Sequence, residues 1–159
     1  MDNDTTPVTR DLTARAIPFR FFHHPGPVNS LEQAALERGQ DQSQVIRSIL
    51  FRMPDNVFVM VLIAGPSQIS WKALRQHLGT SRMTMATDEE VAAVTGYLPG
   101  SVSPFGLTTP VRLLIDENVF KNAEVSLGSG VRSTTVILKS QALRQAFPDA
   151  EVGSFCNEC

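Results

Sequence analysis

The chain has 159 residues, of which 42% are hydrophobic and 19% charged, and its formal net charge is −2. This composition is typical of one globular domain and excludes collagen, coiled coil and disorder. The longest apolar run, residues 57–64, is far shorter than the about 20 residues of a membrane-spanning helix, so no membrane partner is expected. The acidic N-terminus lacks the basic and apolar regions of a secretory signal, which favours a cytoplasmic location.

The fourteen lysines and arginines are spread along the chain rather than gathered in one stretch. A protein that grips long duplex nucleic acid usually presents a basic stripe, because its affinity comes from neutralising phosphates. Any contact with nucleic acid is therefore expected to be small, such as a strand end.

The first third of the chain predicts a flexible arm over residues 1–9, a short helix over 11–16 and a strand over 19–24. A turn at 24–27 follows. The next helix is expected to begin after Ser30 or Asn29 as its cap and to end at Gly39, with Leu31, Ala34, Ala35 and Leu36 as its apolar face.

The middle of the chain predicts a β-hairpin, with strands over 45–53 and 57–64 joined by the turn Pro54-Asp55-Asn56. A helix capped by Ser70 and ended by Gly79, and a short strand over 82–86, come next. Thr87 and Glu90 form a capping box that starts a further helix, which runs to Gly96.

After a turn-rich stretch, strands are expected over 111–115, 123–127 and 134–138, and Ser140 is expected to cap a last helix ending near Phe147. Strands and helices alternate in short pieces. The fold class predicted is therefore mixed α/β (α+β): a single compact domain over residues 10–150, with a mixed, largely antiparallel sheet flanked by helices.

The two cysteines, Cys156 and Cys159, lie in a C-terminal stretch, 151–159, that is expected to be a frayed tail with two free thiols. As Cys-x-x-Cys they could also hold a metal or form a redox pair, but a structural zinc needs four ligands and no second pair exists. No metal or cofactor is predicted.

The stretch from Gly96 to Gly106 holds three glycines and two prolines directly after a helix. Glycine and proline together favour a rigid loop of unusual backbone, which can point amide and carbonyl groups into a pocket. The stretch matches neither a dinucleotide-binding fingerprint nor a phosphate-binding P-loop. A plain connecting loop is the alternative.

This loop, Gly96-Tyr97-x-x-Gly100-x-Val102-Ser103-Pro104-Phe105-Gly106, resembles the signature loop of the YbaK/prolyl-tRNA-synthetase-associated editing-domain family. Weaker likenesses extend over residues 10–147: His24-Pro25 with the segment 29–35, the strand around Arg47, and the turn containing Gly130 and Arg132. The resemblance implies a curled mixed sheet and hydrolysis of the ester that joins a wrong amino acid to the 3′ end of a tRNA. Because nothing in the chain resembles a synthetase catalytic domain, a trans-acting protein is expected.

The family's strand lysine aligns with Arg47, which keeps the positive charge but cannot serve as a general base. The resemblance implies that Arg47 and Gly100 act in catalysis. The substrate-binding residues that it implies are His24, Ser30, Ser48, Ser101, Val102, Ser103, Pro104 and Arg132. The backbone amides of residues 100–103 are expected to bind the ester carbonyl as an oxyanion hole does.

Two function classes stay open at this point. The first is a deacylase of mischarged aminoacyl-tRNA, whose partners are the tRNA acceptor end and, in addition, an aminoacyl-tRNA synthetase. The second is a non-catalytic module that binds a nucleotide, an aminoacyl end or a synthetase with the same pocket, in which case Arg47 marks lost catalysis. For each serine the plainer role is a helix cap or a strand position, and for Arg47 a surface arginine.

Overall fold

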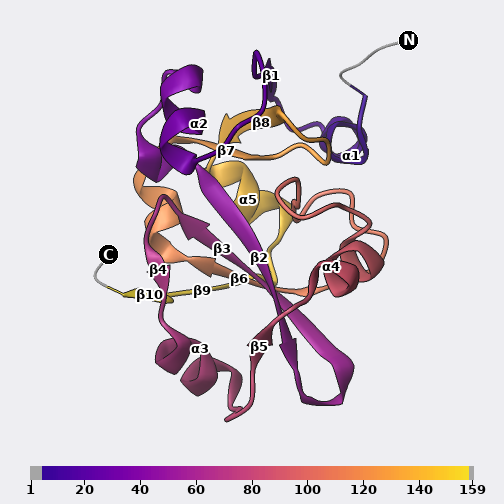
Figure 1. The fold of residues 1–159 in the computed structure, drawn as a ribbon, viewed down its shortest axis with the longest axis vertical. Coiled ribbons are helices and arrows are strands. Elements are labelled where there is room, and N and C mark those ends of the chain that lie inside the picture. The colour runs from indigo at the N-terminus through magenta and orange to yellow at the C-terminus, as the bar shows by residue number, and fades with distance from the viewer. Residues whose placement is uncertain (1–4, 158–159) are drawn as a thin grey trace.

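The computed structural model describes residues 5–157, in which five α-helices and ten β-strands form one mixed α/β domain (Figure 1). The helices are α1 (Pro7–Ala14), α2 (Leu31–Arg38), α3 (Trp71–Leu78), α4 (Asp88–Thr95) and α5 (Gln141–Ala146). The strands are β1 (Arg20–His23), β2 (Ile46–Met53), β3 (Val57–Ala64), β4 (Gln68–Ile69), β5 (Thr84–Met85), β6 (Arg112–Asp116), β7 (Glu124–Gly128), β8 (Thr134–Lys139), β9 (Glu151–Gly153) and β10 (Cys156–Asn157). The predicted fold class is confirmed. Among the described residues, no helix is long and apolar enough to cross a membrane.

Local capping signals place three of the helices as predicted. Ser30, Ser70 and Thr87 each accept a backbone N–H of the first turn at 3.0–3.2 Å, and Gly39, Gly79 and Gly96 end the same helices with φ values of +66° to +81°. Glycine takes this left-handed conformation without the steric cost that a side chain would add. The prediction for Ser140 is wrong in its detail, because its hydroxyl donates to the Asn122 carbonyl at 2.7 Å instead of capping α5.

The N-terminal helix begins earlier than predicted. Thr6 and Thr9 form a reciprocal capping box, and Pro7 occupies the first helical position, so the helix starts there rather than at residue 11. Val8 and Leu12 are fully buried in the main core. The predicted flexible arm is therefore wrong from residue 6 onward, and its first four residues lie outside the described part of the chain.

The β2–β3 hairpin crosses the middle of the molecule and belongs to a five-stranded mixed sheet of order β5-β2-β3-β6-β9 (Figure 1). Successive residues of a strand point to opposite faces. One face, with Ile46, Leu50 and Met60, packs into the main core. The other, with Phe51 and Ile63, packs into a second cluster that includes Leu74 of α3.

A separate three-stranded antiparallel sheet, β1-β8-β7, lies beside one end of this hairpin. The two sheets meet where Val45 forms a parallel bridge with Ser126 of β7. Helix α2 precedes this meeting point in the chain and lies next to β7 in Figure 1. Its predicted apolar face is only partly right: Ala34 and Ala35 are buried, but Leu36 is 80% exposed.

The expected frayed tail is wrong for residues 151–157. Strand β9 pairs in parallel with β6, and β10 pairs with β4. Phe155 is 2% exposed, and its backbone N–H donates to the buried Asp116 carboxylate at 2.8 Å. Cys156 is disulfide-bonded rather than a free thiol. The other cysteine of the chain, Cys159, lies outside the described residues.

Candidate functional site

The glycine- and proline-rich loop after α4 is held in place by hydrogen bonds along its length. The buried Tyr97 hydroxyl donates to the Phe105 carbonyl at 2.6 Å, which closes the loop on itself. The Ser101 carbonyl accepts from Gly130 N at 3.1 Å, and Gly106 N donates to the Asp11 carboxylate at 2.8 Å. These bonds tie the loop to the β7–β8 connection on one side and to α1 on the other.

Two glycines shape this loop in different ways. Gly100 has φ +90°, and a Cβ built on it would meet no atom within 4 Å. Gly128, at the end of β7, is crowded: a Cβ there would lie 2.4 Å from the Val102 carbonyl oxygen. Because Gly128 has no side chain, the loop can lie this close to the end of β7.

A cavity of about 370 Å³ opens between this loop, α2, the start of β2 and the ends of β7 and β8. Five of the predicted site residues border it: Ser30, Arg47, Ser48, Gly100 and Val102. The residues that sequence reasoning missed here include Asn29, Arg38, Gly128, Thr134 and Thr135. Residues from five separated stretches of the chain thus meet in one cavity.

The other five predicted residues lie elsewhere. His24 is 8% exposed and is hydrogen-bonded behind the cavity wall, to Glu37 and Arg38. Ser101 and Ser103 are buried in hydrogen bonds within their own loop, and Arg132 is exposed. Pro104 lines a different cavity. Their roles in substrate binding remain predictions.

Arg47 and Ser48 leave β2 on opposite faces. The half-buried Arg47 guanidinium donates to the Gly65 carbonyl at 2.9 Å and to the Ser67 carbonyl, and burial lowers its pKa. Ser48 lies on the same face as Ile46 and Leu50, and its hydroxyl is buried with no hydrogen-bond partner among the described residues. Arg47 therefore braces the turn after β3, while Ser48 offers an unused hydroxyl at the cavity.

Arg38, at the C-terminal end of α2, is the second cation that borders the cavity. Its Nε donates to Nε2 of His24 at 3.0 Å, and its Nη1 donates to the Ser126 hydroxyl at 2.8 Å. Burial lowers its pKa to about 10, so the guanidinium stays charged at neutral pH. Helical spacing could have flagged this residue, since Arg38 lies four positions after the buried Ala34 and so on the same helix face.

Backbone donors complete the site. The Ser101 backbone N–H donates to the Leu98 carbonyl at 3.1 Å. Within residues 5–157, the amides of Gly100 and Val102 have no protein acceptor, and both residues border the cavity. Two amides beside a hydroxyl and a guanidinium can polarise a carbonyl and stabilise an oxyanion. The part of the chain that the structure describes contains no group of three side chains suited to hold a metal ion.

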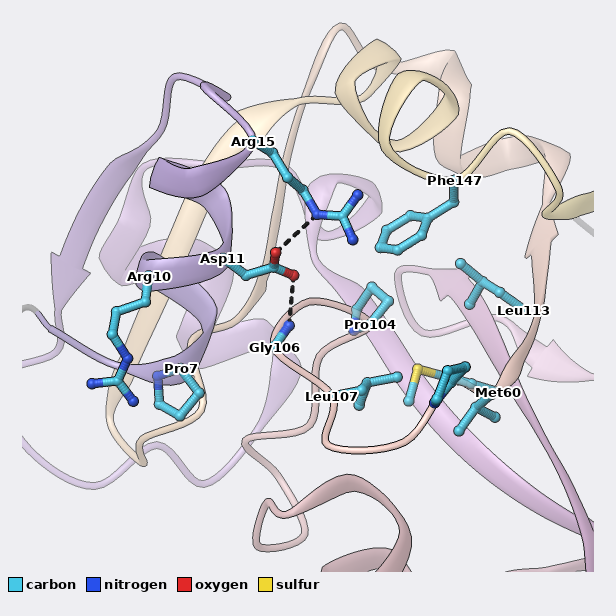
Figure 2. A pocket seen from close by; sticks show the side chains of 12 residues that line it. Pro7, Arg10, Asp11, Arg15, Met60, Pro104, Gly106, Leu107, Leu113 and Phe147 are labelled. Atoms are coloured by element: carbon cyan, nitrogen blue, oxygen red, sulfur yellow. Dashed lines mark hydrogen bonds and ion pairs between the residues drawn. The ribbon is translucent and has the colours of Figure 1, made fainter.

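A larger cavity of about 560 Å³ lies on the other side of the same loop, next to α1 (Figure 2). Its wall is mostly apolar, with Met60, Leu107 and Leu113 among its residues. Figure 2 shows the carboxylate of Asp11 between Arg15 and Gly106, which both donate to it, at 2.9 and 2.8 Å. Asp11 and Arg15 thus satisfy each other at this cavity, and the third charged residue of its wall, Arg10, is exposed to solvent.

Comparison with known proteins agrees with this geometry. The family model "Aminoacyl-tRNA editing domain" matches residues 25–146. The chain is 30% identical over 112 residues to a proline–tRNA ligase of Aquifex aeolicus, covering 69% of this chain but 20% of that protein. It is 27% identical over 143 residues to the multifunctional Ser/Thr-tRNA deacylase ProXp-y of Escherichia coli K12, covering 87% of this chain and 85% of that protein.

A solved structure described as a putative trans-editing enzyme for prolyl tRNA synthetase superposes with a TM-score of 0.88 at 22% identity, covering 99% of both chains. The chain spans about a fifth of the length of the proline–tRNA ligases that it matches. The family model, by contrast, covers most of this chain, including α2, the β2–β3 hairpin and the loop at the smaller cavity. The chain therefore belongs to the aminoacyl-tRNA editing domain family.

Proposed function

We propose that this protein is an aminoacyl-tRNA deacylase that hydrolyses, in trans, the ester between a wrong amino acid and the 3′ end of a tRNA. The observation that carries this proposal is the set of unused donors around one cavity: the amides of Gly100 and Val102 and the hydroxyl of Ser48. Family membership supplies the substrate class to which such donors are suited.

The ester is already activated, so the site has to position it rather than to form a covalent intermediate. The carbonyl oxygen would accept from the Gly100 and Val102 amides, which favour the tetrahedral oxyanion over the planar ester. The neighbouring ribose hydroxyl of the tRNA would orient the attacking water. Positioning and electrostatics would then supply most of the rate.

The partner is the acceptor end of an aminoacyl-tRNA, which agrees with a chain whose net charge is −2 and whose basic residues are spread out. The match over 85% of a relative named as a Ser/Thr-tRNA deacylase supports small amino acids as substrates. The matches to proline–tRNA ligases support a functional association with that synthetase. The place of action would be the cytoplasm, where charged tRNA is used.

A deacylation panel tests the proposal. The purified chain is incubated with tRNAs charged with alanine, cysteine, serine or threonine, and the surviving ester is followed over time against a reaction without protein. We expect faster loss of at least one mischarged ester and no loss of a correctly charged prolyl-tRNA. If every ester survives while the protein binds the charged tRNA, the chain is a binding module and not an enzyme.

A further inference from the structure

Helix α2 places at the smaller cavity a partly buried cation, Arg38, that forms no direct ion pair among the described residues. Within residues 5–157, no carboxylate lies at ion-pair distance from Arg38, and its nearest partners are the neutral acceptors His24 and Ser126. Taking a guanidinium out of water is costly unless an opposite charge and hydrogen bonds compensate for it. Only Glu37, which lies beyond His24, offsets this charge electrostatically, so the guanidinium itself has no anionic partner in direct contact.

A chain of hydrogen bonds holds Arg38 in place. Because Nε2 of His24 accepts from Arg38, the imidazole proton lies on Nδ1, which donates to the Glu37 carboxylate at 2.6 Å. Gln33 donates to the other oxygen of Glu37 at 2.8 Å, and this bond, followed by that from His24, lowers the pKa of Glu37. Beyond Arg38, the Ser126 hydroxyl donates to Gln40 at 2.9 Å.

This chain uses two of the five N–H groups of the guanidinium. The second N–H of Nη1 and both on Nη2 donate to no acceptor in the described part of the protein. Arg38 borders the cavity together with the unpartnered Ser48 hydroxyl, and the same wall includes the apolar Ala34 and Leu127. A fork of unused donors in a wall of mixed polar and apolar side chains is suited to two oxygens of one anionic group.

Arg15, at the larger cavity, shows the opposite arrangement. It donates to Asp11 at 2.9 Å and to the Ala146 carbonyl at 3.0 Å, and its guanidinium stacks on Phe147. Its charge is paired within the protein. Each guanidinium uses two of its five N–H groups, but only Arg15 has a carboxylate in direct contact, so Arg38 is the one that lacks an anionic partner.

We infer that Arg38 binds an anionic oxygen of the substrate, held in position by His24 and Ser126. This inference rests on the proposed function for the identity of the substrate. An aminoacyl-tRNA carries such oxygens in two places: the phosphate of the terminal adenosine and, for some amino acids, a side-chain carboxylate. Arg47 borders the same cavity, but its guanidinium is directed at the Gly65 and Ser67 carbonyls of the turn after β3.

Four stable substrate analogues distinguish the two sources. They are 3′-aminoacylamino-3′-deoxyadenosines that carry alanyl or aspartyl groups, each with and without a 5′-phosphate. The dissociation constants are measured by calorimetry for the wild type, Arg38→Leu, Arg38→Lys and the control Arg82→Gln, which removes an exposed arginine remote from the cavity. Ser126→Ala adds a variant that keeps Arg38 but removes one of its anchors.

We expect Arg38→Leu to weaken binding about 10- to 100-fold for analogues that carry one kind of anion and to leave the others unchanged. Arg38→Lys should keep part of the affinity, Ser126→Ala should show a smaller loss with the same selectivity, and Arg82→Gln should match the wild type. A loss confined to phosphorylated analogues identifies the phosphate, and one confined to aspartyl analogues identifies the carboxylate. If Arg38→Leu unfolds, the Lys and Ser126→Ala variants carry the test.

The inference is overturned if Arg38→Leu loses the same affinity for all four analogues or loses none. It is also overturned if the wild type binds the analogues with and without the extra anion equally well. Turnover is measured separately on charged tRNA. If the wild type hydrolyses no ester but its binding of anionic analogues depends on Arg38, the proposed function is refuted and this inference stands. Normal binding and turnover by Arg38→Leu refute this inference and keep the function.

Discussion

The two cavities on either side of the loop after α4 differ in what they leave unsatisfied. The larger one, of about 560 Å³, is mostly apolar, and its Asp11 and Arg15 pair with each other. The smaller one, of about 370 Å³, is bordered by Arg38 without a carboxylate and by Ser48 without a hydrogen-bond partner among the described residues. A buried polar group without a partner costs free energy that a ligand can recover. Unsatisfied groups rather than volume therefore point to the smaller cavity as the site.

The largest expected effect comes from crowding the shared loop at Gly128. A Cβ there would lie 2.4 Å from the Val102 carbonyl oxygen and 2.9 Å from that of Ser101, so Gly128→Ala has to displace the loop. We expect a loss of about 1–3 kcal/mol in unfolding free energy and of about 100-fold in kcat/KM, because misplaced donors no longer meet the carbonyl. Denaturant unfolding and deacylation kinetics measure the two losses.

Gly100→Ala is the matched variant, because its Cβ would meet no atom within 4 Å and only its φ of +90° carries strain. We expect a cost of about 1–2 kcal/mol and a fall of at least about 10-fold in turnover. Equal effects of the two alanines would mean that the approach of the loop to β7 does not position the site.

Filling each cavity in turn is the next sharpest test of the comparison. Val28 borders the smaller cavity and Leu107 the larger one, and both are partly exposed, so an indole can be added without rebuilding the core. We expect Val28→Trp to lower kcat/KM at least about 10-fold by excluding the substrate, and Leu107→Trp to change it less than about 2-fold. If only Leu107→Trp loses turnover, the larger cavity and not the smaller one is the active site.

A smaller effect is expected from substitutions on the two faces of β2, where Arg47 is hydrogen-bonded and Ser48 has no described partner. Arg47→Ala removes charge-assisted hydrogen bonds to the Gly65 and Ser67 carbonyls and should cost about 1.5–3 kcal/mol of stability. Ser48→Ala removes a buried hydroxyl without a described partner, so it should keep or raise stability but lower kcat/KM about 2- to 10-fold. Unchanged melting with lost turnover in Arg47→Ala would instead make Arg47 a substrate ligand.

The smallest effect is expected at an ion pair away from both cavities. Arg112 donates to Glu151 at 2.6 and 2.7 Å and, with a further bond from His77, lowers the pKa of that carboxyl from 4.5 to about 2. The folded state thus favours the ionised form. The pair stabilises the fold above pH 4.5, and this contribution disappears as the pH falls towards 2.

Because these groups are partly exposed, the contribution should not exceed about 1 kcal/mol. Thermal melts between pH 2 and 7 should show a steeper acid loss for the wild type than for Glu151→Gln, with equal deacylation at neutral pH. Identical slopes would show that the pair adds nothing to stability. A loss of turnover in Glu151→Gln would extend the functional region beyond the smaller cavity.

Local chemistry in the sequence determined the helices that carry caps, the β2–β3 hairpin and the loop from Gly96 to Gly106. A cap such as Ser30 bonds three residues along the chain, and Gly39 ends the helix by its own φ, so neither depends on the rest of the fold. The loop could be singled out because proline fixes φ and glycine allows conformations closed to other residues, wherever they occur. Its resemblance to an editing domain led to the family that the comparison then showed.

Only the tertiary structure decided which residues face the cavity. Arg47 and Ser48 are neighbours on β2 and both border the cavity, but the packing of its two faces bonds the arginine to the Gly65 turn and leaves the serine hydroxyl without a described partner. Arg38 owes its exposed donors to contacts with His24 and with Ser126, 88 residues away. The C-terminal strands, too, form only because partners far away in sequence, β6 and β4, offer their edges. Hydrogen bonds of such long range leave no local periodicity, so the sequence alone could not have revealed them.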